Sequence, residues 1–296
     1  MKLLITGASG LYGSKLAQIA LTKNYEVYSS DIQSRVVYGN FVKLDVSVKG
    51  QIEEAFKTIK PDVVVHAASL TDVDKCELNK EIAWKVNIEG TKNIVEAAKI
   101  TGSFLIYIST DYIFNGKTGR YKETDKPGPI NYYGLTKLKA EEIVKNQTEY
   151  FIARPSVIYG AAPAAGKINF ALWLIEALRK NERVKIVTNQ WNTPTLNTNL
   201  AEMTLEVIKR RLTGTYHLCG ATRVSRLEFA ELIADVFGLK KSLIDSVLSS
   251  QFMWPAKRPI DSSLDISKAN MTLESKPLEL REALKSLKFE LSQKIS

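Results

Sequence analysis

The sequence of 296 residues holds only two cysteines, far apart in the chain, and two histidines. Cys76 and Cys219 give neither a disulfide framework nor a zinc-binding spacing, and His66 and His217 cannot complete one, so we expect no metal site. No apolar run reaches the ~18 residues that a membrane span needs. Met1 leads straight into an apolar strand, so no signal peptide is expected either. These absences predict a cytoplasmic protein without a membrane partner.

The charge balance is basic, but its distribution does not favour nucleic acid. The formal net charge is +9 and the pI is about 9.3. The Lys and Arg residues are scattered through amphipathic segments rather than clustered with aromatic residues, which is typical of a solvated surface. We therefore predict no nucleic-acid partner. An apolar content of 45% is enough for a sizeable core in one large domain with a smaller lobe.

Strands and helices alternate through the first half of the chain, which predicts an α/β fold built on a doubly wound, Rossmann-type parallel sheet. After Arg154 the alternation weakens. The expected strands are 3–5, 26–30, 41–44, 62–65, 104–108, 150–153, 184–187 and 214–218, and the expected helices are 14–21, 49–59, 82–99, one carrying Lys137, 170–180, 227–237 and 278–287.

A glycine turn follows the first apolar strand and precedes a helical pattern. Gly7, Gly10 and Gly13 supply bare backbone there, and the helix N-terminus adds free N–H groups and a positive dipole end, a combination typical of a pyrophosphate site. Asp31 ends the second strand, where its carboxylate can accept the adenosine ribose hydroxyls and favour NADH over NADPH. Arg35 lies close enough to accommodate a phosphate, so NADH or NADPH remains open as the cofactor.

A second motif supplies the chemistry. Tyr133 and Lys137 are four residues apart on a predicted helix and therefore share a face, so the ammonium is expected to lower the pKa of the phenol from about 10 toward working pH. Such a tyrosine can donate a proton to a carbonyl oxygen while hydride reaches the carbon. Thr110 follows a strand at the same sheet edge, where its hydroxyl could hold that oxygen.

With both motifs in place, the chain resembles the extended short-chain dehydrogenase/reductases over nearly its whole length. The glycine pattern, His66-Ala67-Ala68 and the helix motif from Val86 to Asn93 carry the resemblance. It implies a catalytic triad of Thr110, Tyr133 and Lys137. The residues expected around the dinucleotide are Gly7, Ser9, Gly10, Leu11, Tyr12, Gly13, Asp31, Asp45, Val46, Ala67, Ala68, Tyr133 and Lys137.

Within that family several stretches look like the dTDP-4-dehydrorhamnose reductases, which reduce a 4-keto sugar nucleotide to dTDP-L-rhamnose. These stretches include 70–77, 109–116, 131–141, 190–195 and 257–264. The resemblance implies that Thr71, Val73, Asp74 and Arg258 lie near the sugar nucleotide. It also implies a NAD(P)-binding domain over residues 1–155, with a return segment near 188–213, and a mainly substrate-binding lobe over 156–296. A homodimer is possible.

Two features of the sequence differ from the reductase pattern or fit a second kind of protein equally well, so other functions remain open. Val157 stands where such reductases often have an aromatic residue, which leaves the sugar open and allows another sugar-nucleotide epimerase or reductase. The segment 229–237 is equally similar to the regulatory β subunit of methionine adenosyltransferase, which sets a non-catalytic NAD(P)-binding role against the enzyme. A dehydratase is disfavoured, because Thr110 is followed by Asp111 and Tyr112 rather than by an Asp-Glu pair. We also expect the loop 161–166 to close over the bound sugar.

Overall fold

A seven-stranded parallel sheet organises the molecule, as the computed structural model shows for residues 1–33, 36–147, 149–162 and 168–293. The strand order is β11-β6-β5-β4-β1-β2-β3, so the predicted doubly wound sheet is confirmed. Its inner strands are apolar and buried on both faces, as parallel sheets require. The strands are β1 (Lys2–Thr6), β2 (Glu26–Asp31), β3 (Asn40–Lys43), β4 (Val63–His66), β5 (Phe104–Ile108), β6 (Tyr150–Ala153) and β11 (Gly214–Tyr216).

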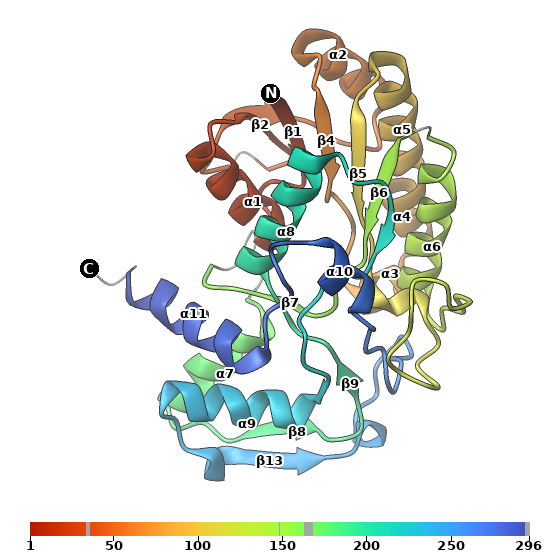
Figure 1. The fold of residues 1–296 in the computed structure, drawn as a ribbon. Coiled ribbons are helices and arrows are strands. Elements are labelled where there is room, and N and C mark those ends of the chain that lie inside the picture. The colour runs from red at the N-terminus through yellow and green to blue at the C-terminus, as the bar shows by residue number, and fades with distance from the viewer. Residues whose placement is uncertain (34–35, 148, 163–167, 294–296) are drawn as a thin grey trace.

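Helices cover both faces of this sheet in the upper part of Figure 1. One face carries α2 (Lys49–Ile59), α5 (Gly90–Thr101) and α6 (Tyr132–Val144) over a core that includes Leu4 and Val64. The other carries α1 (Leu11–Thr22) and α8 (Asn197–Arg210). Helix α8 comes from the second half of the chain, so that half completes the sheet's cover.

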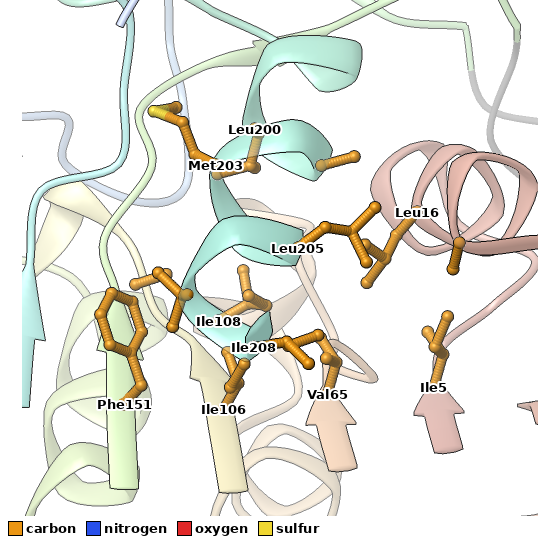
Figure 2. Packing of buried hydrophobic residues seen from close by; sticks show 14 of the residues in the cluster. Ile5, Leu16, Val65, Ile106, Ile108, Phe151, Leu200, Met203, Leu205 and Ile208 are labelled. Carbon is orange, nitrogen blue, oxygen red and sulfur yellow. The ribbon is translucent and has the colours of Figure 1, made fainter. Parts of the chain in front are cut away.

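The packing under α8 is the larger of the two cores. In Figure 2, Leu205 of α8 points toward Leu16 of α1, Ile208 points toward the strands, and Met203 leaves the helix on the side away from α1. All of these side chains and Leu200 are buried in one cluster. The strands contribute further apolar side chains to this cluster, namely Ile5, Val65, Ile106, Ile108 and Phe151. Each such side chain stabilises the fold by roughly 1.5–3 kcal/mol when fully buried, so α8 cannot leave the sheet without a large loss.

The lower part of Figure 1 is a smaller lobe with a core of its own, which includes Tyr159, Ile175 and Phe229. Its helices are α7 (Phe170–Arg179), α9 (Arg226–Phe237) and α11 (Leu280–Ser292). Three two-stranded sheets join them, formed by β7 (Ile158–Tyr159) with β10 (Thr195–Leu196), β8 (Val184–Val187) with β13 (Ile244–Val247), and β9 (Trp191–Asn192) with β12 (Val224–Ser225).

The structure departs from the expected elements in several places. The helix expected over 82–99 consists of α4 (Lys80–Trp84), the π-helical turn η1 (Lys85–Glu89) and α5. Of the loop expected over 161–166, residues 163–166 lie outside the described residues. The pattern also did not predict the long helix α8 or the short strands β7, β9, β10, β12 and β13. The other unpredicted elements are α3 (Val73–Leu78), η2 (Asp111–Ile113), η3 (Lys241–Leu243), η4 (Ser249–Gln251) and α10 (Ser267–Thr272). In the described part of the chain, none of the helices has the length and apolar character to cross a membrane.

Candidate active site

A cavity of about 800 Å³ runs along the carboxyl edge of the sheet and reaches the smaller lobe. Ligands bind at this edge in open α/β sheets, because the strand ends and helix N-termini meet there. The structure brings most of the predicted site residues together in the lining of this one cavity. They are Gly7, Gly10, Leu11, Tyr12, Gly13, Asp31, Asp45, Val46, Ala67, Ala68, Thr71, Val73, Thr110, Tyr133 and Lys137.

The glycine turn forms one end of the cavity with no room for side chains. Gly7 has φ +71°, and a Cβ there would lie 2.7 Å from the backbone nitrogen of Ala68. A Cβ at Gly13 would overlap the carbonyl oxygen of Gly7. Gly10 caps α1 without a side-chain hydrogen bond, so the first N–H groups of the helix stay available for an anion. This cradle fits a dinucleotide pyrophosphate.

The carboxylate of Asp31 lies beside the turn. Its Oδ2 accepts the backbone N–H of Ser9 at 3.0 Å, and its Oδ1 accepts that of Gln33 at 3.1 Å. The Ser9 hydroxyl is buried and has no hydrogen-bond partner among the described residues, a group that a ribose or phosphate oxygen could satisfy. Arg35, the residue considered for a 2′-phosphate, lies outside the described residues.

Thr110 and Tyr133 meet across the cavity because α6 begins close to the end of β5. Asn131 caps α6 by accepting the N–H of Gly134 at 2.8 Å, and its amide holds the carbonyl of Lys257. A Cβ at Gly134 would overlap the carbonyl oxygen of Tyr112, so only glycine lets the first turn approach so closely. The Thr110 side chain lies close enough to the Tyr133 hydroxyl to lower its pKa somewhat. The two hydroxyls therefore lie side by side in the lining of the same cavity.

The predicted effect of Lys137 on Tyr133 is wrong in this structure. Burial raises the pKa of Tyr133 above its ordinary value of 10, and the neighbouring Thr110 side chain offsets only part of this rise. Burial also lowers the pKa of Lys137, to about 7. The Lys137 ammonium donates to the carbonyl of Ile108 at 2.7 Å and lies 4.3 Å from the centre of the Tyr107 ring. The spacing of four residues correctly predicts that Tyr133 and Lys137 share one face of the helix. It could not show that the fold removes both side chains from water.

The π-helical turn η1 places Asn87 behind α6. Its side-chain oxygen accepts from the Ser69 hydroxyl and the Leu70 N–H, while its amide donates to the Leu70 carbonyl and the Thr136 hydroxyl. Thr136 lies next to Lys137 on α6. π-Helical turns often occur at functional sites, and this one fixes the cavity loop against the helix that carries Tyr133.

Asp74 and Arg258 do not line the cavity. They form an ion pair, with Nη1 of Arg258 2.5 Å and Nη2 2.6 Å from the two carboxylate oxygens. Asp74 also accepts the Ala256 N–H at 3.0 Å. The pair therefore fastens the segment 256–262 to α3 at the side of the cavity, because both oxygens are engaged within the protein. Ser9 also lies outside the lining, although its backbone holds Asp31.

Sequence reasoning missed the contribution of the smaller lobe. Arg226, the first residue of α9, lines the cavity, lies close to the Tyr112 side chain and has its guanidinium 5.2 Å from the centre of the Phe170 ring. It forms no salt bridge with the carboxylates of the described residues, so it could bind an anion. No local pattern distinguishes it from a solvated arginine at a helix start. In the part of the chain that the structure describes, no three His, Cys, Asp or Glu side chains lie close enough together to hold a metal ion.

Val157 lines the same cavity in an unusual backbone conformation. Its φ is +40°, a region that β-branched residues rarely adopt. Such a conformation costs roughly 1–3 kcal/mol, and it is retained where the surroundings enforce it, often at functional sites. Strand β7 begins at the next residue, and its parallel pairing with β10 holds Val157 in this conformation at the cavity wall.

The geometry agrees with the comparisons to known proteins. The family model described as the RmlD substrate binding domain matches residues 1–292. The chain belongs to this family. A probable low-salt glycan biosynthesis reductase, Agl14 of Haloferax volcanii, is 31% identical over 99% of both chains. The dTDP-4-dehydrorhamnose reductase of Aggregatibacter actinomycetemcomitans is 30% identical, covering 97% of this chain and 98% of its own length.

One solved structure and one further relative extend this comparison. The dTDP-4-dehydrorhamnose reductase of Bacillus anthracis, solved in complex with NADP, superposes with a TM-score of 0.89 at 30% identity over 98% of this chain and 99% of its own. Methionine adenosyltransferase 2 subunit beta of Bos taurus is 28% identical, covering 90% of this chain and 81% of its own length. The relatives of this chain thus include both kinds of protein that the sequence motifs suggested.

Proposed function

We propose that this protein reduces a 4-keto sugar nucleotide with NADH or NADPH, and that dTDP-4-dehydro-L-rhamnose is its substrate and dTDP-L-rhamnose its product. The observation that carries the proposal is the meeting of Thr110, Tyr133 and Lys137 in one cavity with the glycine turn. The named reductases that match nearly the whole chain support the substrate.

The cofactor would be held mostly by backbone. The turn of Gly7, Gly10 and Gly13 would take the pyrophosphate, Asp31 the adenosine ribose, and Asp45 and Val46 the adenine. Ala67, Ala68 and Lys137 line the path toward the catalytic hydroxyls. When bound, the nicotinamide supplies the hydride.

Tyr133 is the proton donor in this proposal. Because burial raises its pKa, the phenol keeps its proton at neutral pH, which is the form that a general acid needs in the direction of reduction. The proton would pass to the carbonyl oxygen as hydride reaches the neighbouring carbon. Thr110 lies beside the Tyr133 hydroxyl and would orient it for this transfer.

The substrate half of the cavity is lined by Thr71, Val73 and Arg226. A sugar nucleotide carries a diphosphate, and a guanidinium without a carboxylate partner suits such an anion. Arg226 would therefore bind the diphosphate, while Asp74 and Arg258 position the neighbouring segment from outside the lining.

A turnover assay tests the proposal. Purified protein is mixed with NADH or NADPH and a panel of dTDP- and UDP-linked 4-keto sugars, and nicotinamide absorbance is followed. We expect turnover with the dTDP sugar. Tyr133→Phe should keep its affinity for cofactor and sugar nucleotide while kcat falls by roughly 10² to 10⁴, the usual contribution of general acid catalysis.

A binding role without turnover is the second candidate, supported by the similarity to methionine adenosyltransferase 2 subunit beta. It predicts that the parent protein binds NADPH but oxidises none of it with any sugar in the panel. In that case Tyr133→Phe would change nothing measurable, and the reductase proposal would be abandoned.

A further inference from the structure

A buried carboxylate lies directly beside the catalytic hydroxyl. Asp111 is 3% exposed and accepts three hydroxyl hydrogen bonds. Thr110 donates to its Oδ1 at 3.0 Å, and Ser156 and Ser262 donate to its Oδ2 at 2.9 and 2.5 Å. Burial raises its pKa, and these hydroxyls oppose that rise. The carboxylate is thus satisfied by neutral donors alone among the described residues.

The contacts around Thr110 decide where its single proton goes. Its hydroxyl oxygen accepts the N–H of Tyr112 at 3.2 Å, and the side chain lies beside that of Tyr133. A hydroxyl has one proton and two acceptor positions. Because Thr110 donates that proton to Asp111 and accepts the N–H of Tyr112, these two contacts fix its side chain in one orientation beside Tyr133.

The other oxygen of Asp111 connects the site to distant parts of the chain. Ser156 precedes the strained Val157 in the cavity lining, and Ser262 ends the segment that Arg258 and Asp74 fasten to α3. One carboxylate therefore contacts the catalytic hydroxyl, the loop after β6 and the segment beside the substrate half of the cavity.

We propose that Asp111 is a positioning residue for the reduction. It accepts the Thr110 proton and so fixes the Thr110 side chain beside the Tyr133 hydroxyl, which keeps its own proton for the carbonyl oxygen. Through Ser262, the same carboxylate links the segment 256–262 to this alignment. The inference rests on the proposed function, since alignment of Tyr133 matters only for proton transfer.

A double-mutant cycle tests the link between Asp111 and Thr110. Asp111→Ala should lower kcat by roughly 10- to 100-fold, the scale of a small misplacement of reacting groups, with NADPH affinity kept within about twofold. Thr110→Val should then add little, because both changes remove the same alignment. Asp111→Asn retains an acceptor oxygen and should recover most of kcat. Losses that multiply would overturn the inference, because Asp111 would then act independently of Thr110.

Two neighbouring serines provide the matched control. Ser262→Ala removes a donor to Asp111, whereas Ser263→Ala removes a hydroxyl that donates to Asp261 instead. We expect kcat to fall severalfold in the first variant and to stay at the parent value in the second. Equal effects would show that the segment matters only for folding.

Crystal structures of the parent and of two other Asp111 variants provide a test that needs neither turnover nor a folded Asp111→Ala protein. We expect the Thr110 side chain to hold its orientation in the parent and in Asp111→Asn, and to rotate away in Asp111→Leu. An unchanged Thr110 in Asp111→Leu overturns the inference even if the parent proves inactive. A parent that turns over no sugar, with the rotation as expected, defeats the proposed function alone.

Discussion

At the scale of single residues, burial acts on Tyr133 and Lys137 in opposite directions. It raises the pKa of the phenol and lowers that of the ammonium, because each group loses the solvation of its charged form. Sequence spacing could place the two side chains on one face of a helix. It could not show how completely the fold removes them from water.

The lowered pKa of Lys137 predicts how stability changes with pH. Its pKa is about 7 in the folded protein against 10.5 as the ordinary value, so the unfolded chain binds more protons between these limits. Stability contributed by this group therefore rises from pH 7 upward. The free energy of unfolding of the parent, measured relative to Lys137→Met by urea denaturation, should be higher at pH 9 than at pH 6. A difference that stays constant would contradict the assigned pKa.

Arg226 offers a prediction on substrate binding. If its guanidinium binds the diphosphate in ground state and transition state alike, Arg226→Gln should raise KM for the sugar nucleotide roughly tenfold or more, with kcat nearly unchanged. Arg281→Gln is the control, since Arg281 faces Asp235 on the surface. A fall in kcat with KM unchanged would place Arg226 at the reacting atoms instead.

At the scale of elements, the sequence predicted best where one periodicity runs without interruption. Helix α2 begins and ends where the pattern indicated, and the inner strands agree within about a residue, because continuous apolar runs are typical of buried parallel strands. The π-helical turn η1 was not predicted, since one extra residue per turn leaves the apolar spacing nearly intact. The short strands of the smaller lobe depend on partners far away in the chain.

The glycine turn provides an element-scale prediction. Gly10→Val would place a branched side chain within about 3.0 Å of the Gly7 carbonyl and in the space intended for the pyrophosphate, so NADH binding should be lost. Gly50→Val is the matched control, because a Cβ at Gly50 meets nothing within 4 Å. Fluorescence titration with NADH measures both. Equal affinities in the two variants would remove the turn from the cofactor site.

At the scale of the whole molecule, a buried ion pair joins α6 to the end of β6. Arg154 and Glu141 are 2% and 0% exposed, with Nη2 2.6 Å from Oε2. Arg154→Met leaves an unpaired buried carboxylate and should cost about 3–5 kcal/mol in the free energy of unfolding. Adding Glu141→Leu should restore most of that loss. Urea denaturation of the two variants measures both effects, and equal stability of the single and double variants would contradict the expected coupling.

Strand β11 gives the sheet a particular order of assembly. It pairs with β6 only after some sixty intervening residues, and α8 arrives just before it to cover the face that β1, β4 and β5 leave apolar. A chain still being synthesised therefore leaves the edge of β6 unpaired and an apolar face uncovered until residue 216 has emerged. Chains with unpaired strands and exposed apolar surface are prone to aggregate, so the second half of this protein protects the first during folding.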